Sequence, residues 1–407
     1  MIKTNLGYYV VENKNYFNKI HAILEANKTL SNINWIFNDQ IFDQVDWTQE
    51  PTLPLDHYYC QRAQQIRSQF DYVILMLSGG ADSTNMFYSF VNHNIWPDEV
   101  IASAPLSGLS NFTTDPYNHN ANNIVSETFL AQIPLLNKIS QLYGNKIRCT
   151  VNDYFHVMTN LKSDHWLYED SNHWVHPSGG VRWKLDNLSH IKKLAEQGKR
   201  IAVVVGLDKP YICRSVVGNL YSVVMDSAIN VVSDHFSEKF LNVETILFYY
   251  SSDLPDLMIK QAHMVCRWFY QRENVLEKNS FLWDRSRGSA FNRNSCRGSG
   301  YQRTIVPIIY PMLDNKIWQA DKQSTGLLGG QEVDSWLYKI HNKQKFIELT
   351  NSDTKLFFKN INVRYWESKD DVMQGFKRFY KHWLIGHESQ FLKNSEPINI
   401  DNEKFFF

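Results

Sequence analysis

The feature that most constrains this chain is an apolar segment that runs directly into a glycine turn and then into a helical pattern. Residues 72–77 are uninterrupted apolar residues, which is typical of a parallel strand buried on both faces. The turn Ser78-Gly79-Gly80-Ala81-Asp82-Ser83 follows, and apolar residues then recur at helical spacing over 86–91. Two glycines let a ligand approach the backbone closely. The free N–H groups of the first helical turn favour an anion, so we predict a phosphate-binding turn.

The side chains of this turn suit a nucleotide and a metal ion. Ser78 and Ser83 supply hydroxyl donors, and the Asp82 carboxylate is able to hold Mg²⁺ beside phosphate oxygens. The alternative is a purely structural glycine turn in which an acid and a hydroxyl cap the helix. No Gly-Lys-Ser/Thr follows the glycines, so the turn is not a Walker A loop.

Segment 78–83 matches the SGGxDS signature at every fixed position, and the chain resembles the PP-loop (N-type) ATP pyrophosphatases. That group includes NAD synthetase, GMP synthetase and the synthetase domain of asparagine synthetase. The resemblance implies an α/β fold with a parallel five-stranded sheet of the adenine nucleotide alpha hydrolase-like kind, with helices on both faces. It implies ATP and Mg²⁺ as cofactors, cleavage of ATP between the α- and β-phosphates, and Asp82 as the metal ligand. The residues expected to contact ATP or pyrophosphate are Ser78, Gly79, Gly80, Ala81, Asp82, Ser83, Ser103, Gly206 and Lys209.

A second site element is expected where another buried strand, 201–205, ends. Alternating strands and helices from 72 to 205 predict a parallel sheet with right-handed crossovers, and ligands bind at the carboxyl ends of such strands. Segment 206–214 is therefore predicted to share a rim with the glycine turn. Lys209 is a compact cation suited to phosphate, Asp208 suits Mg²⁺ or a substrate amine, and Arg214 suits a carboxylate or phosphate. A surface Asp-Lys turn before a proline is the alternative.

We expect three regions along the chain: an N-terminal cap over 1–68, the ATP-binding α/β domain over 69–235, and a mainly helical substrate or lid region over 236–407. Further strands are predicted at 99–104 and 146–151, and helices at 121–143 and 371–384. The cap lacks the cysteine after Met1 with which the glutaminase domain of asparagine synthetase opens, because Ile2 stands there. The chain is therefore not expected to make its own ammonia from glutamine.

Two features of the last third are candidates for substrate binding. Lys260 and His263 lie three residues apart on one face of a predicted helix, where they would contact substrate or simply face solvent. Five arginines fall between Arg285 and Arg303, among serine, glycine and asparagine. This segment is a lid over ATP and an anionic substrate, a contact strip for nucleic acid, or a solubilising loop.

Composition narrows the choice of partners. The formal net charge is zero, which gives no global attraction for nucleic acid. Apolar runs are too short to span a membrane, and no signal peptide precedes the first strand. Five cysteines lie far apart with no C-x-x-C pair, which argues against a zinc ribbon and a redox pair and indicates the cytoplasm. The oligomeric state is not predicted.

Three functions are consistent with these residues. The first is a ligase that adenylates a carboxylate or amide oxygen of a small molecule or peptide, releasing pyrophosphate, before a nitrogen nucleophile displaces AMP. The catalytic residues would be Asp82, Asp208 and Lys209, with Arg214, Lys260 and His263 binding the substrate. The second is modification of a nucleobase in tRNA or DNA, and the isolated cysteines disfavour its thiolating branch. The third is a nucleotide sensor without turnover.

Overall fold

The computed structural model describes residues 6–111, 127–159, 183–207, 209–215, 217–226, 236, 240–271, 283–284, 305–310, 313, 361–366 and 376–393. Its central element is a five-stranded parallel sheet with the strand order β10-β7-β4-β5-β6. The strands are β4 (Tyr72–Met76), β5 (Glu99–Ala104), β6 (Arg148–Asp153), β7 (Ile201–Val205) and β10 (Val243–Leu247). The predicted strands 99–104 and 201–205 are confirmed at both ends.

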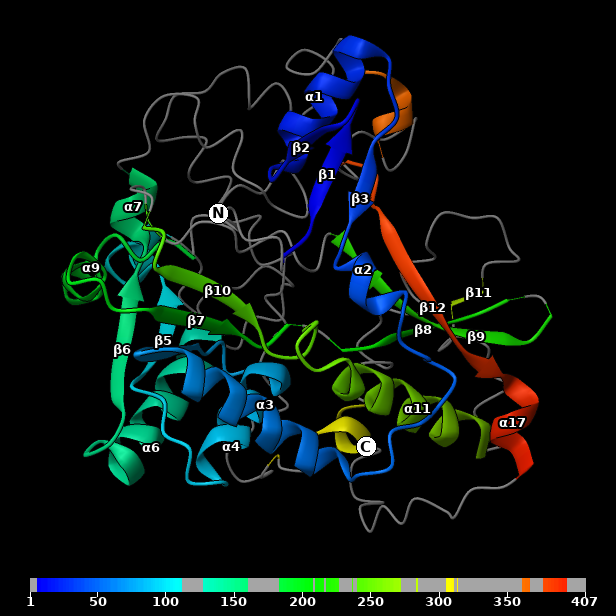
Figure 1. Ribbon diagram of the computed structural model, residues 1–407. Coiled ribbons are helices and arrows are strands. Elements are labelled where there is room, and N and C mark those ends of the chain that lie inside the picture. Colours follow the sequence, from blue (N-terminus) through cyan, green and yellow to red (C-terminus); the bar gives the residue numbers. More distant parts are fainter. Residues whose placement is uncertain are drawn as a thin grey trace.

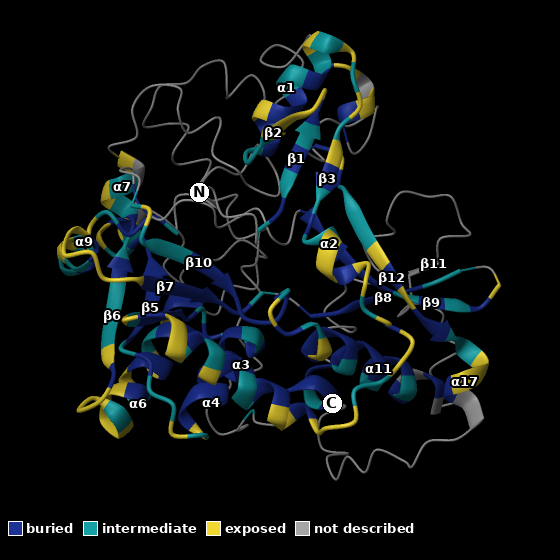
Figure 2. Ribbon diagram, in the orientation of Figure 1, coloured by how far each residue is buried: buried dark blue, intermediate teal, exposed yellow. Residues whose placement is uncertain are grey.

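The sheet is buried because its strands carry apolar side chains toward both faces. Along β4, Val73 and Leu75 pack into one cluster, while Ile74 and Met76 pack into another. All residues of β5 and β7 are buried, and both strands are dark blue in Figure 2. A continuous apolar run is the expected sequence of such a strand, since neither face meets water.

Helices cover both faces of this sheet, as expected. On one side lie α3 (Leu55–Gln69), α4 (Ala81–Val91), α6 (Ile133–Tyr143) and α11 (Pro255–Gln271), the first three stacked beneath the strands in Figure 1. A π-helical segment, η2 (Thr128–Gln132), leads into α6. On the opposite face α9 (Ser189–Glu196) packs Ile191 and Ala195 against the sheet.

The order of the strands places a topological switch between β4 and β7. From β4 the chain moves outward through β5 to β6, and it then returns past β4 to form β7 on the other side. The loops that leave β4 and β7 therefore diverge at this point, and a crevice between them is where open α/β sheets bind ligands.

Two smaller sheets flank the central one (Figure 1). The N-terminal sheet is antiparallel, in the order β2-β1-β3, and the other sheet has the order β11-β8-β9-β12. Elements of the N-terminal part are β1 (Tyr8–Val11), β2 (Lys14–Tyr16), α1 (Lys19–Thr29), β3 (Asn34–Ile36) and α2 (Asp39–Phe42). Elements of the other sheet and its surroundings are β8 (Tyr211–Arg214), β9 (Asn219–Met225), β11 (Trp283–Asp284), β12 (Tyr380–His387) and α17 (Glu388–Lys393). Short segments are η1 (Leu106–Asn111), α7 (Phe155–Thr159), η7 (Val363–Tyr365) and a helical turn over 305–309.

A buried carboxylate joins these two smaller sheets. Asp226 is fully buried and accepts a hydrogen bond from the Tyr9 hydroxyl at 2.8 Å and an ion pair from Lys19 Nζ at 2.7 Å. The backbone N–H of Phe379 also donates to Asp226, at 3.1 Å. Three donors to one carboxylate offset the cost of removing this charge from water.

Among the described residues of the C-terminal third, one element differs from its sequence prediction. The helix predicted over 371–384 is wrong at its end, because residues 380–387 form β12, which pairs antiparallel with β9. The parallel sheet also extends past residue 235, since β10 pairs with β7. Among the described residues, none of the helices is long and apolar enough to cross a membrane.

Candidate functional site

The candidate site lies at the switch point, where the loops after β4 and β7 meet. Gly206 directly follows β7, and a Cβ built on it would lie 3.0 Å from the backbone oxygen of Asp82. The two segments predicted to share a rim are thus in contact. A side chain at position 206 would push into the loop backbone, which explains the glycine.

Hydroxyl groups close the loop 78–83 on itself. Ser83 Oγ accepts a hydrogen bond from the N–H of Ser78 at 3.2 Å, and it lies 3.1 Å from Ser78 Oγ. Ser78 Oγ in turn accepts from the N–H of Gly80 at 3.2 Å. Gly80 then precedes α4 in an extended conformation, and no side chain caps the helix. The loop is preshaped, with the positive end of the α4 dipole at its centre.

Both the backbone conformation and the packing at position 79 favour glycine. Its φ is +71°, in the left-handed region, and a Cβ there would lie 2.7 Å from Ala131 Cβ and 3.0 Å from Ala131 C on η2. The loop therefore sits directly against the π-helical segment. Such segments are frequent at functional sites.

Substitution of Gly79 by alanine is expected to lower the free energy of unfolding by more than the same change at Gly198. Gly198 has a similar φ of +78°, but a Cβ added there would have no neighbouring atom within 4 Å. Gly198→Ala should cost about 1–2 kcal/mol from backbone strain alone, whereas Gly79→Ala adds roughly 1–3 kcal/mol from overpacking. Urea denaturation of the two variants measures the difference. Equal losses would contradict tight packing of the loop on η2.

The Asp82 carboxylate is the centre of the site. Lys209 Nζ, on the loop after β7, lies 2.6 Å from Asp82 Oδ2. The Tyr310 hydroxyl donates to Asp82 Oδ1 at 2.5 Å, and the Tyr249 hydroxyl donates to the Asp82 backbone oxygen at 2.7 Å. The Asp82 side chain is 23% exposed and that of Lys209 is 7% exposed. A cation and an anion are thus held together at a site that solvent still reaches.

Polar contacts from three helices support the two tyrosines. The Tyr59 hydroxyl on α3 donates to the backbone oxygen of Ile309, and Gln261 on α11 donates to the Tyr59 hydroxyl at 2.9 Å. Asn85 on α4 donates to the Tyr249 hydroxyl at 3.1 Å. Burial, and to a lesser degree nearby groups that include Asp82, raise the pKa of both Tyr249 and Tyr310 well above its ordinary value. Both phenols therefore remain protonated donors at neutral pH.

A buried polar cluster lies at the carboxyl ends of β5 and β6. Asn152 donates to Ser103 Oγ at 3.2 Å, and Gln132 on η2 donates to the backbone oxygen of Ser103 at 3.2 Å. Gln132 also donates to the buried Glu127 carboxylate at 3.2 Å. Ser103 was predicted to contact nucleotide, and its place at the end of β5 is next along the sheet from the loop after β4. Its function stays a prediction.

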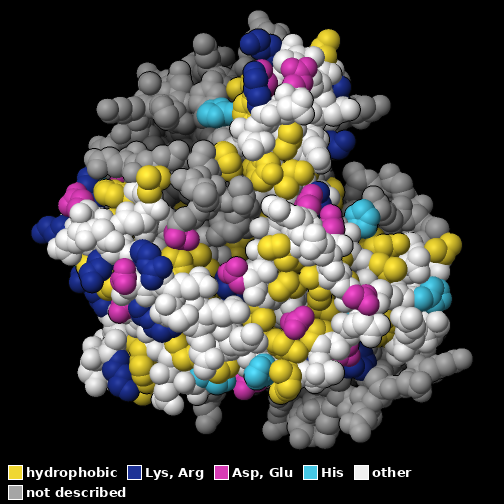
Figure 3. Space-filling view, viewed as in Figure 1, with side chains coloured by type: hydrophobic (Ala, Val, Ile, Leu, Met, Phe, Trp, Pro, Cys, Tyr) yellow, Lys and Arg dark blue, Asp and Glu magenta, His cyan; other side chains and the backbone are white. Residues whose placement is uncertain are grey.

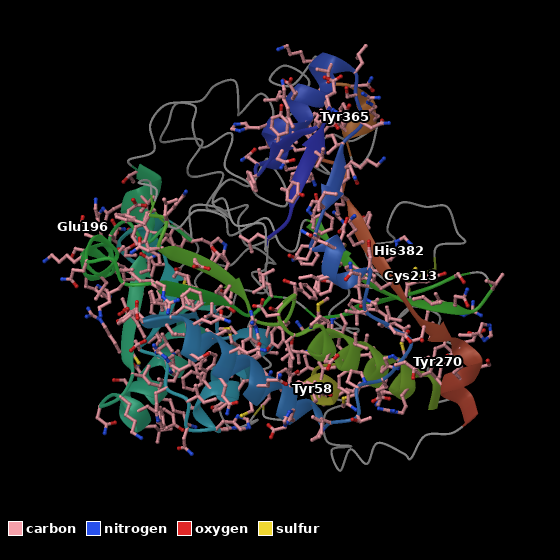
Figure 4. The ribbon with its side chains drawn as sticks, in the orientation of Figure 1. Tyr58, Glu196, Cys213, Tyr270, Tyr365 and His382 are labelled. Carbon is pink, nitrogen blue, oxygen red and sulfur yellow. The ribbon has the colours of Figure 1, made fainter. Side chains whose placement is uncertain are left out.

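The three residues predicted to bind substrate have partners within the protein. Arg214 pairs with both carboxylate oxygens of Glu388, at 2.6 and 2.7 Å, and Tyr270, labelled beside α17 in Figure 4, joins them at 3.1 Å. Lys260 Nζ lies 2.8 Å from Glu50 Oε1, and His263 Nε2 lies 2.9 Å from the backbone oxygen of Trp47. Among the described residues, no contact joins these three side chains to the loop 78–83.

Other predicted features fall outside the described residues. Asp208 lies outside them, and so does the whole segment Arg285–Arg303. On the face shown in Figure 3, basic and acidic side chains are interspersed, in keeping with 42 residues of each sign in the whole chain. The nucleic-acid strip predicted for the arginines remains a prediction.

Sequence reasoning did not find Tyr249 and Tyr310 as site residues. Tyr249 lies just after β10, 167 residues from Asp82, and Tyr310 lies 228 residues from Asp82. A tyrosine next to a buried apolar run gives no local sign that its hydroxyl meets a distant carboxylate. Only the tertiary structure shows that these two hydroxyls lie at Asp82.

The donor set at Asp82 fits a magnesium ion that arrives with a nucleotide. Within the described residues, no three histidine, cysteine, aspartate or glutamate side chains gather to hold a metal by themselves. Mg²⁺ is usually bound through one or two carboxylates together with substrate phosphates and water. The Asp82 carboxylate, which is 23% exposed and lies in the first turn of α4, meets that requirement.

No protein-family model matches this chain, and no curated protein matches it either.

Proposed function

We propose that this protein is an ATP-dependent ligase that forms AMP and pyrophosphate. In this proposal it adenylates a carboxylate or amide oxygen of its substrate, and a nitrogen nucleophile then displaces AMP. The observation that carries the proposal is the contact of Asp82 with Lys209 at the switch point of the sheet. A phosphate-binding turn of SGGxDS sequence is thereby joined to a buried cation.

In this proposal the donor groups and Lys209 would bind the phosphates, and Asp82 would bind the metal ion. The backbone N–H groups at the start of α4 and the Ser78 and Ser83 hydroxyls would bind the β- and γ-phosphates, which leave as pyrophosphate. Lys209 would neutralise the charge that grows on this leaving group, a form of stabilisation that often dominates phosphoryl and nucleotidyl transfer. Asp82 would hold Mg²⁺, which would supply further positive charge beside the phosphates. No covalent intermediate on the protein is needed.

Two finer predictions accompany this function. The strand order β10-β7-β4-β5-β6 supports membership of the adenine nucleotide alpha hydrolase-like folds, which the resemblance implies. The cytoplasm is the proposed location, and it is supported by the thiols of Cys60, Cys149 and Cys266, which form no disulfide.

The test is release of pyrophosphate and AMP from ATP and Mg²⁺ by the full chain. A panel of carboxylates, amides, amino acids, tRNA and DNA should be screened by ATP–pyrophosphate exchange. Exchange stimulated by a small carboxylate or amide supports the ligase. Stimulation by nucleic acid alone would replace it with a nucleobase-modifying enzyme. Release of ADP and phosphate instead of AMP and pyrophosphate would refute both.

A further inference from the structure

Each oxygen of the Asp82 carboxylate already has one protein partner of a different kind. Lys209 Nζ lies 2.6 Å from Oδ2, and the Tyr310 hydroxyl donates to Oδ1. A carboxylate accepts about four hydrogen bonds, so each oxygen keeps capacity for a further ligand. The 23% exposure of the side chain leaves an approach from solvent.

Tyr310 is buried and is held in place by several contacts. The residue is 1% exposed, and its N–H donates to the backbone oxygen of Val306 at 2.9 Å. The preceding residue, Ile309, is anchored through its carbonyl by Tyr59. The Tyr310 ring lies 5.4 Å from that of Tyr249, centroid to centroid. This packing fixes the Tyr310 hydroxyl in the orientation that donates to Asp82.

Of the two partners of the Asp82 carboxylate, Lys209 is the one that would leave it when a nucleotide binds. Its backbone oxygen accepts a hydrogen bond from Tyr250 at 2.6 Å, which fixes the main chain. Its ammonium stands on a flexible four-carbon stem, and in the proposed function it moves from Asp82 toward phosphate. During that exchange the Tyr310 hydroxyl keeps the carboxylate oriented.

We propose that Tyr310 is a positioning residue that orients the Asp82 carboxylate toward the metal–nucleotide complex. The inference rests on the proposed function for the nature of that complex. Groups that orient metal-binding carboxylates in this way commonly change metal affinity or activity by about 10–100-fold when removed.

Tyr310→Phe tests the inference, with Tyr9→Phe as the matched control. Both changes delete one buried hydroxyl that donates to an aspartate carboxylate, but Tyr9 donates to Asp226, which joins the two smaller sheets, and Tyr310 donates to Asp82. Binding of Mn²⁺ in the presence of ATP, followed by electron paramagnetic resonance, gives a readout that does not depend on turnover. Mg²⁺ dependence of pyrophosphate release gives the second readout, and thermal melting checks the fold.

The expected result is Mn²⁺ affinity and kcat lowered about 10-fold in Tyr310→Phe, with both within about 3-fold of wild type in Tyr9→Phe. Equal shifts in the two variants, or none in Tyr310→Phe, overturn the positioning role. If wild type binds Mn²⁺ with ATP but releases no pyrophosphate, the ligase fails while the affinity difference still decides the role of Tyr310. If wild type binds no Mn²⁺ with ATP, Asp82 is not a metal ligand and both proposals fall.

Discussion

Replacement of Asp82 by alanine is expected to abolish AMP formation, with a fall in kcat on the order of 1,000-fold or more. Asp82 is the carboxylate that pairs with Lys209, and it belongs to the preshaped turn itself. In the proposed mechanism Asp82 is the protein ligand of the metal–nucleotide complex, so the variant would lose that ligand, and Lys209 would lose this partner. Pyrophosphate release at saturating ATP and Mg²⁺ measures the effect.

Because Asp82→Ala leaves a buried ammonium without this carboxylate, the variant Asp82→Asn should be measured beside it. The amide keeps the shape and an oxygen acceptor but removes the charge, so activity should still be lost while the fold is kept. Asp39 provides a matched control, since its carboxylate is 22% exposed and pairs with Lys381 at 2.5 Å. Asp39→Asn should retain wild-type turnover. An Asp82→Asn variant with wild-type turnover would refute the mechanism.

Replacement of Lys209 by alanine is expected to lower kcat by about 100–1,000-fold, which corresponds to roughly 2.7–4 kcal/mol of transition-state stabilisation. The Lys209 side chain is 7% exposed, so in the proposed mechanism its charge would act on the leaving pyrophosphate with little screening by water. The effect should fall on kcat more than on the KM for ATP, because the charge on the leaving group is greatest in the transition state.

Lys381 is the corresponding control for this change. It also forms an ion pair with an aspartate, but it joins β12 to the N-terminal part of the chain, and its side chain is 22% exposed. Lys381→Ala should change stability slightly and leave kcat unaltered. If Lys209→Ala also leaves kcat unaltered, its pairing with Asp82 serves structure alone.

The central sheet could be predicted because its strands carry their own signal. In 72–76 and 201–205 the apolar residues are continuous, since each strand is buried in the sheet. Segment 99–104 carries Glu99 and Ser103 among its apolar residues, but turn residues bound it closely. The meeting of Gly206 with the loop after β4 also follows from sequence, because parallel strands bring their carboxyl ends to one edge.

The second sheet could not be predicted in the same way. Strand β12 is only half buried, with Trp383 and Ile385 inward and Leu384 exposed, and its partner β9 lies more than 150 residues earlier. A short, half-buried segment with aromatic residues also fits one face of a helix. Pairing with β9, rather than local preference, decides that these residues form a strand.

The meeting of the loop 78–83 with the segment that carries Lys209 was predicted from sequence, whereas the tyrosine contacts of Asp82 were not. Arg214 shows the limit of reasoning from residue type, because a guanidinium suited to a substrate carboxylate is bound by Glu388 instead. Which carboxylate an arginine meets depends on how β8 and α17 pack, and no motif records that.

The contact between Tyr310 and Asp82 also orders events during synthesis of the chain. The loop that carries Asp82 is made 228 residues before Tyr310, an interval on the order of ten seconds or more at usual rates of translation. Strand β4 is already made when the interval begins, β5, β6, β7 and β10 are made within it, and all five can pair before it ends. The carboxylate therefore receives its last partner only when the late segment over 305–310 folds back onto α3, so the nascent protein acquires a complete site after its central sheet.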